Sequence, residues 1–184
     1  GKLPYIMDGE TRIGDSSLII AHLKESRRID PDATLTDAER SEATALQRLL
    51  EDHLYFAIAY SRFLDPEGFA TVGRDFFTSV PAVFRPLARG YFCDRVRRTL
   101  MHQGLGRHSQ QEIYAQARED LAALSTRLGD RPFLLGERLT TIDAIAYGFL
   151  ANILFVPIET ELKRTCQGFL NLASWCEAME TGIY

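Results

Sequence analysis

The sequence predicts a mainly helical protein in which a β-hairpin and one helix precede a larger helical bundle. Three observations predict this fold class. Strand and turn residues occur within the segment 1–25, and apolar residues recur at helical spacing across most of 36–128. The segment 141–155 is apolar on nearly every side of a helix, which is typical of a central, buried helix.

Residues 2–7 and 11–13 are predicted to form the two strands of the hairpin. The Asp8-Gly9 pair suits the turn between them, because glycine accepts a positive φ and aspartate tolerates one. A two-stranded hairpin is only marginally stable alone, and the chain begins within it. We therefore expect that further chain precedes Gly1 in the whole protein.

The first helix is predicted to begin at Asp15 and Ser16, which offer side-chain oxygens just before the apolar run 18–23. The start of a helix carries unpaired N–H groups and a partial positive charge, so it suits a carboxylate ligand. The Ser16 hydroxyl can join such a contact. These two residues are therefore candidates both for a plain helix cap and for a ligand site.

A polar connector follows at 26–34, with Asp30-Pro31 as its breaker, and divides the chain into domains at 1–28 and 29–184. Thr36 and Glu39 have the spacing of a capping box at the start of the next helix, and Pro66 with Gly68 is expected to end it. The segment 69–80 is predicted to hold a short buried element. Helices are predicted, from apolar spacing and capping residues, at 36–63, 83–101, 109–128, 141–155, 159–166 and 170–180.

The apolar helix 141–155 has a capping box of its own, formed by Thr140 and Asp143. These two residues start a buried helix and need no ligand, so we assign them a structural role. His53 falls on the apolar stripe of its helix and is interpreted as a core histidine with hydrogen-bond partners rather than as a base.

Composition and charge exclude several classes of function. The formal net charge of −4 gives no case for nucleic acid, which calls for a basic face. No apolar run reaches about 18 residues, so no membrane span is expected, and no signal peptide is visible.

Cys93, Cys166 and Cys176 are odd in number and lack metal-ligand spacing. We expect reduced thiols, no metal site and a cytoplasmic protein.

The hairpin followed by Asp15-Ser16 resembles the second half of the thioredoxin-like domain of glutathione transferases. The segment 136–143, GERLTTID, is similar to the capping motif at the start of that family's central helix. The resemblance covers the whole chain and implies a thioredoxin-like remnant over 1–28 and the all-helical C-terminal domain over 29–184. Residues 51–56 and 169–176 are most similar to the subgroup of failed-axon-connections and metaxin-related proteins and their bacterial relatives.

The resemblance implies a glutathione site at five positions. Pro4 matches the family's cis-proline, and the backbone of Leu3 would pair with the cysteinyl backbone of glutathione. Asp15 would meet the γ-glutamyl ammonium, while Ser16 and the helix start would meet its carboxylate. Lys2 lies where a cation could reach the glycyl carboxylate. The alternative for Leu3-Pro4 is an edge strand with a trans-proline.

No residue of this chain matches the family's catalytic Tyr, Ser or Cys, which would lie upstream of Gly1. The first hypothesis is an enzyme, a homodimer that adds the glutathione thiolate to a small apolar electrophile, with Tyr55 or Tyr60 lining the co-substrate pocket. The second is a non-catalytic binding or scaffold protein of the same fold. A third is a module that uses its helical face only for protein partners.

Overall fold

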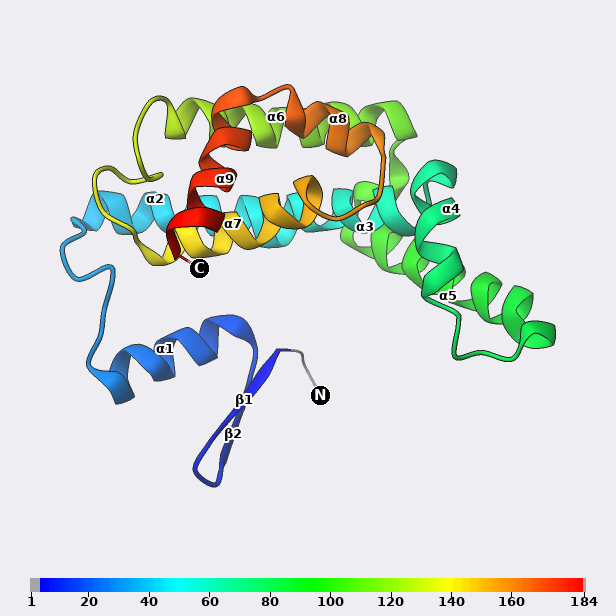
Figure 1. The fold of residues 1–184 in the computed structure, drawn as a ribbon, viewed down its shortest axis with the longest axis horizontal. Helices are drawn as coiled ribbons and strands as arrows, with labels where there is room; N and C mark the ends of the chain where they lie inside the picture. The colour runs from blue at the N-terminus through cyan, green and yellow to red at the C-terminus, as the bar shows by residue number, and fades with distance from the viewer. Residues whose placement is uncertain (1–3, 184) are drawn as a thin grey trace. The chain divides into compact units, whose positions relative to one another are not determined.

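The computed structural model describes residues 4–183, apart from the side chains at 74, 75 and 183. The chain divides into two compact units, Gly1–Thr36 and Asp37–Tyr184 (Figure 1). The first unit holds a hairpin and a helix, and the second is entirely helical in its described part. The predicted fold class is confirmed.

The first unit starts with strands β1 (Tyr5–Asp8) and β2 (Thr11–Gly14), which pair antiparallel with Tyr5 opposite Gly14 and Asp8 opposite Thr11. Gly9 and Glu10 therefore form a two-residue loop. Gly9 has φ +61°, the left-handed conformation that the first loop position of a type II′ hairpin turn requires. The hairpin is confirmed, with the turn one residue later than the Asp8-Gly9 pair suggested.

Helix α1 (Ser16–Arg27) packs on the hairpin through a polar contact and a small apolar one. His22 Nε2 lies 2.7 Å from Asp8 Oδ2, and this hydrogen bond holds the pKa of the Asp8 carboxyl below its usual range. Ile19 is the buried apolar side chain of this unit, whereas Leu18 and Met7 are mostly exposed. The described part of the unit therefore buries little apolar surface of its own.

The helical unit follows the predicted order closely. Its helical elements are α2 (Asp37–Arg48), η1 (Leu49–Leu54), α3 (Tyr55–Phe63), α4 (Pro66–Asp75), η2 (Ala82–Phe84), α5 (Arg85–Gln103), η3 (Leu105–Arg107), α6 (Gln110–Leu128), α7 (Thr141–Leu154), α8 (Glu161–Gln167) and α9 (Leu170–Ile183). Of these, η2 and η3 are short 3₁₀ turns, and η1 is a π-helical turn. The predicted helix 36–63 is present as α2, η1 and α3, which follow one another without a gap, but its middle part, η1, is π-helical instead of α-helical. A π-helical turn inserts a residue into the helical ladder, which apolar spacing does not reveal.

Helix α4 corrects the sequence interpretation of 69–80. The preceding helix α3 ends at Phe63, as predicted, but Pro66 also starts a further helix. It occupies the first turn of α4, and the Asp65 side chain caps that helix by accepting from Glu67 N at 2.8 Å. The expected burial also holds only in part, because Phe77 is buried whereas Phe76 is 53% exposed. Proline is compatible with both a helix stop and a helix start, so the sequence alone does not separate the two.

Gly68 has a packing role that its interpretation as a helix breaker did not predict. A Cβ at this position would lie 1.9 Å from the Ser61 carbonyl oxygen of α3 and 3.1 Å from Thr160 Cγ2. The missing side chain therefore lets the α4 backbone approach α3 closely.

Helix α7 lies between α2, η1, α8 and α9 in the core of the helical unit (Figure 1). Its buried face carries Ile142, Ala146, Leu150 and Ile153, but Ala144, Gly148 and Asn152 on another face are exposed. The expectation of a central helix is thus confirmed, but one face of this apolar helix is exposed. Leucines supply most of the fully buried core: Leu50, Leu54, Leu100, Leu121, Leu124, Leu128, Leu134, Leu150 and Leu172.

The start of α7 is fixed by a buried carboxylate. Asp143 accepts hydrogen bonds from Thr140 N at 2.8 Å, Thr140 Oγ1 at 2.6 Å and Leu134 N at 2.7 Å, and it has no exposed surface. The first bond belongs to the capping box, the second joins the side chains of the same two residues, and the third ties the preceding loop to the helix. Asp143 thus joins the helix start to the loop 129–139.

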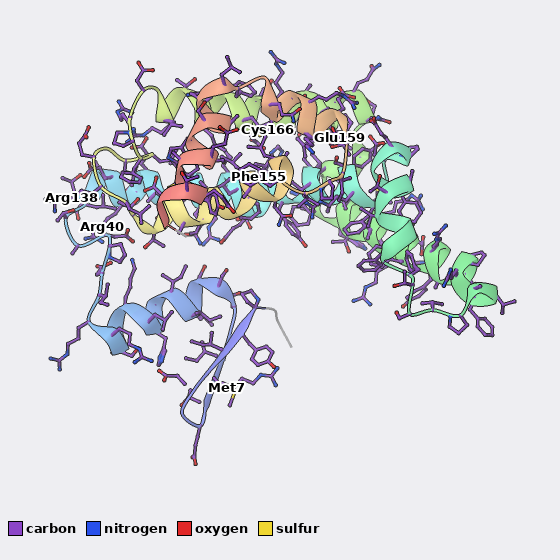
Figure 2. All side chains as sticks on the ribbon, viewed as in Figure 1. Met7, Arg40, Arg138, Phe155, Glu159 and Cys166 are labelled. Carbon is purple, nitrogen blue, oxygen red and sulfur yellow. The ribbon has the colours of Figure 1, made fainter. Side chains whose placement is uncertain are left out.

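The cysteines are free thiols. Cys166 on α8 and Cys176 on α9 are fully buried, and burial raises the pKa of each thiol to about 12. Figure 2 labels Cys166 within the helical unit and Phe155 just after the end of α7. With such pKa values both thiols stay protonated at neutral pH and act as small apolar core residues.

Candidate functional site

The described candidate residues of the glutathione site meet where β1 begins and α1 starts. Asp15 N donates to the Pro4 carbonyl oxygen at 3.1 Å, directly beyond the strand pair of Tyr5 and Gly14. This bond links the proline to the helix cap, so the structure brings Pro4, Asp15 and Ser16 together. Lys2 and Leu3, the other two predicted positions, lie outside the described residues.

Asp15 holds an unusual backbone conformation, with φ 88° and ψ 126°. Such a conformation costs a non-glycine residue about 1–3 kcal/mol. It is held by the bond to Pro4, by the Asp15 carbonyl accepting from Ile19 N at 3.0 Å, and by the Asp15 carboxylate accepting from Ser17 N at 3.1 Å. Strain of this kind clusters at ligand sites, where the surrounding structure maintains it.

Ser16 is the first residue of α1, and its side chain is exposed. The first turn of α1 carries no acidic residue, and its last turn carries Lys24 and Arg27. The N-terminal positive end of the helix dipole is therefore opposed in α1 only by the capping Asp15. This corner offers a hydroxyl and helix N–H groups to an anion, with a carboxylate one residue away for a cation. That charge pattern fits the α-amino acid end of a small peptide.

The two tyrosines predicted for a co-substrate pocket lie in different surroundings. Tyr55 is half exposed and packs edge-on against Phe56, with ring centroids 5.1 Å apart. The Tyr60 ring packs edge-on against Tyr114 of α6 at 5.9 Å, and burial raises the pKa of its hydroxyl. The pocket between them stays a prediction.

Sequence reasoning missed a buried polar cluster around Asp65. This carboxylate is almost fully buried and accepts from Tyr114 Oη, from Gln110 Nε2 at 3.1 Å and from Glu67 N. Burial, followed by the contact with Asp65, raises the pKa of the Tyr114 hydroxyl, so Tyr114 is a donor and not a base. The one local signal for it was an aspartate directly before Pro66, where a helix cap is expected.

His53 lies in the π-helical turn and has two polar partners on α6. Its Nδ1 is 2.5 Å from Asp120 Oδ2, and its Nε2 is 3.2 Å from Gln116 Oε1. Burial raises the pKa of Asp120, while the hydrogen bond to His53 opposes that rise. His53 therefore joins the long helix to α6. It has the expected hydrogen-bond partners, but its side chain is 35% exposed, so it is not the core residue that its place on the apolar stripe suggested.

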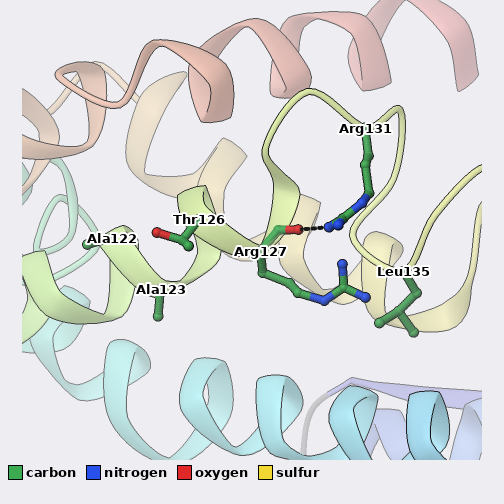
Figure 3. Close-up of a pocket in the computed structure, with 6 residues that line it drawn as sticks. All are labelled: Ala122, Ala123, Thr126, Arg127, Arg131 and Leu135. Atoms are coloured by element: carbon green, nitrogen blue, oxygen red, sulfur yellow. Dashed lines mark hydrogen bonds between the residues drawn. The ribbon is translucent and has the colours of Figure 1, made fainter.

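One surface hollow of about 730 Å³ lies along α6 and is lined by Ala122, Ala123, Thr126, Arg127, Arg131 and Leu135 (Figure 3). Its two guanidinium groups already have partners. Arg131 Nη1 donates to the Arg127 carbonyl oxygen at 2.7 Å, and Arg127 pairs with Glu42 of α2. The hollow is therefore a helix-packing feature with satisfied charges.

Two further properties of the described residues bear on the kind of site. Within residues 4–183, no group of three or more His, Cys, Asp or Glu side chains is placed to hold a metal ion. No helix in the same part of the chain combines the length and hydropathy that crossing a bilayer requires.

Two family models match the chain. The model described as the glutathione S-transferase N-terminal domain matches residues 1–68, and the model described as the glutathione S-transferase C-terminal domain matches residues 117–179. The first match contains the corner of Pro4, Asp15 and Ser16. The second contains α7 with its capping box.

Among curated proteins, the chain is 37% identical over 161 residues to isoprene-epoxide–glutathione S-transferase of Rhodococcus sp. (strain AD45), covering 85% of this chain and 67% of that protein. It is 28% identical over 189 residues to failed axon connections of Drosophila melanogaster, covering 95% and 45%. It is 30% identical over 165 residues to the metaxin-1 homolog of Caenorhabditis briggsae, covering 88% and 52%. The chain thus spans about half to two thirds of the length of these relatives.

Proposed function

The chain belongs to the glutathione S-transferase family, and from that premise we propose that it binds glutathione at the β1–α1 corner. It also resembles the subgroup that includes failed axon connections and the metaxins. In this proposal the γ-glutamyl end of glutathione lies against the start of α1. The bound thiolate then attacks a small apolar electrophile.

The observation that carries the proposal is the strained Asp15, held between Pro4 and the first turn of α1. Its carboxylate takes the ammonium of the γ-glutamyl group, and the Ser16 hydroxyl with the helix N–H groups takes the carboxylate. Both charged ends of one amino acid are thus recognised within two adjacent residues. The family model that matches residues 1–68 supports the same placement.

The predicted contacts of Leu3 and Lys2 complete the proposed site. The Leu3 backbone would pair with the cysteinyl backbone, and Lys2 would meet the glycyl carboxylate. Formation of the thiolate would need a hydroxyl or thiol group that stabilises it and lowers the thiol pKa. The residues of this chain therefore bind and orient glutathione, and they position its sulfur.

The co-substrate is proposed to be a small apolar electrophile, by analogy with the relative whose name specifies isoprene epoxide. Tyr55 and Tyr60 are the proposed lining residues. The proposal also includes a cytoplasmic homodimer with reduced thiols. Light scattering of the purified protein measures the mass, and a monomer would refute the dimer.

Replacing Ser16 by alanine tests the site. Loss of one charge-assisted hydrogen bond is expected to weaken glutathione binding by about 1.5–3 kcal/mol, as measured by isothermal titration calorimetry. Ser41→Ala on α2 is the matched control, because that hydroxyl donates to the Asp37 carbonyl within its own helix. Unchanged affinity in Ser16→Ala would refute the assignment.

The second candidate is a binding or scaffold protein without turnover, and the likeness to failed axon connections and the metaxin-1 homolog favours it. A conjugation assay with glutathione and a small epoxide separates the two candidates. Turnover supports the enzyme. Glutathione binding without turnover across a panel of electrophiles supports the second candidate.

A further inference from the structure

The segment 76–103 carries an apolar surface that the helical core does not use. We call this segment, which contains η2 and α5, the arm. Its large exposed apolar side chains are Phe76 (53% exposed), Val83 (80%), Phe84 (58%), Leu87 (75%), Tyr91 (70%) and Met101 (43%). In Figure 1 the N-terminal part of α5 extends beyond the rest of the helical unit. Contiguous exposed apolar groups of this size mark interaction surfaces.

The inner face of the arm is firmly packed, so the exposure of the outer face does not reflect a loose segment. The Phe92 ring lies 5.0 Å from Phe63 and 5.9 Å from Phe77, in edge-on contacts. Arg89 donates to the Gly73 carbonyl oxygen of α4, and its guanidinium lies 5.8 Å from the Phe77 ring centroid. These contacts hold α5 against α3 and α4 and leave the opposite face outward.

Three of these exposed residues, Val83, Leu87 and Tyr91, form one row along that outward face, whereas the Phe76 ring packs against Phe63 and Phe92. Leu87, Tyr91 and Arg95 lie four residues apart within α5, and this spacing places their side chains on one side of the helix. Val83 lies four residues before Leu87, in the turn η2 that leads directly into α5. Arg98 lies seven residues beyond Tyr91 and therefore falls on the same side. On the same side of α5, the apolar side chains of the row are thus followed directly by the cationic side chains of Arg95 and Arg98.

The arm is also the cationic part of an acidic chain. Residues 76–103 contain five arginines and a single acidic residue, Asp94, while the whole chain has a net charge of −4. Asp94 pairs with Arg98 at 2.6 Å, and the Arg95 and Arg97 side chains are exposed. A partner for this face must accept apolar side chains and carry negative charge.

We propose that the outer face of the arm docks onto an anionic lipid surface. The row of Val83, Leu87 and Tyr91 enters the boundary between headgroups and acyl chains, and Arg95 and Arg98 contact the acidic headgroups. The projecting shape suits a lipid surface, because inserted side chains need no matching groove. A second copy fits less well, because it would bring two sets of arginines together.

Co-sedimentation with vesicles tests the proposal. The probes are phosphatidylcholine vesicles with about 30% phosphatidylserine and vesicles of phosphatidylcholine alone. The protein is expected to bind the anionic vesicles at least tenfold more tightly, and the preference is expected to decrease as salt increases. Equal binding to both vesicles, or no binding to either, overturns the proposal.

Two matched pairs of variants assign the binding to the arm. Leu87→Glu is expected to weaken binding at least tenfold, whereas Leu170→Glu on α9, where the side chain is 76% exposed, leaves it unchanged. The double variant Arg95→Gln with Arg98→Gln is expected to weaken binding about 25-fold, since each arginine near an anionic surface contributes about fivefold. Arg107→Gln with Arg138→Gln is its control, because both side chains are exposed elsewhere.

Circular dichroism establishes that each variant is folded before binding is compared. Equal losses in Leu87→Glu and Leu170→Glu would overturn the assignment to the arm. Sedimentation velocity provides the remaining test. A dimer that dissociates in Leu87→Glu would assign the face to a second copy and overturn the lipid proposal.

Discussion

Asp15 connects local backbone strain with proposed ligand binding at the scale of a single residue. Its φ of 88° is unfavourable for any residue with a side chain, yet three hydrogen bonds around it maintain the conformation. A cap alone does not need this strain, because Ser109 caps α6 from the extended region. The strain sets the carboxylate and the helix start at fixed positions for two opposite charges.

The variant Asp15→Asn removes the negative charge of the Asp15 side chain and keeps its size and shape. Asparagine keeps the capping oxygen and tolerates positive φ, so the melting temperature is expected to change by less than about 3 °C. Loss of the carboxylate is expected to weaken glutathione binding by about 1.5–3 kcal/mol. Calorimetry and a thermal melt on the same sample measure both. An unchanged affinity would contradict the proposed ammonium contact.

Gly68 gives a second prediction at this scale. Gly68→Ala places a Cβ 1.9 Å from a backbone oxygen of α3, so the two helices must move apart, and the free energy of unfolding is expected to fall by at least about 2 kcal/mol. Gly90→Ala on α5 is the matched control, since nothing lies within 4 Å of its added Cβ. Helix propensity predicts that the control is neutral or more stable by up to about 1 kcal/mol. Urea unfolding of both variants checks the difference, and similar curves would contradict it.

Capped and strongly apolar elements could be predicted from the sequence, and elements defined by tertiary contacts could not. The boxes at Ser109–Glu112 and Thr140–Asp143 contain their own partners within four residues, so the starts of α6 and α7 were correctly predicted. Helix α4 was missed because Pro66 signals both an end and a start. The contact that fixes it joins Asp65 to Tyr114, 49 residues away.

The same contrast applies to the candidate site. Asp15 and Ser16 were predicted from a helix-start pattern, while the strain at Asp15 and its bond to Pro4 depend on strand pairing that no local pattern contains. The exposed face of α7 was also unpredictable. An apolar helix sequence gives the length of a core helix, but not which of its faces has a neighbour.

Asp143 gives the prediction for the element α7. Asp143→Ala removes the acceptor of three hydrogen bonds from a fully buried position, so about 3 kcal/mol of the free energy of unfolding is expected to be lost. Asp143→Asn retains one acceptor oxygen and similar volume, and a smaller loss is expected. Urea unfolding followed by circular dichroism measures both. A loss below about 1 kcal/mol in Asp143→Ala would show that the cap is dispensable.

At the scale of the whole molecule, the two units have different proposed roles. The first unit holds the proposed glutathione site, although Ile19 is the buried apolar residue of its described part. The second unit has a leucine-rich core around α7 and exposes the apolar row of the arm. Glutathione binding is thus proposed for the first unit, and lipid docking is proposed for the second. Variants of one unit are expected to leave the other property unchanged.

The most direct measurement of the proposed glutathione site is an NMR titration of the ¹⁵N-labelled protein with glutathione. Binding at the β1–α1 corner predicts saturable shifts of the amide signals of Asp15, Ser16 and Ser17, with signals of α5 and α9 unchanged. The shifts are expected to vanish or need far more glutathione in Asp15→Asn. Saturable shifts confined to the helical unit, or no shifts at millimolar glutathione, would contradict glutathione binding at this corner.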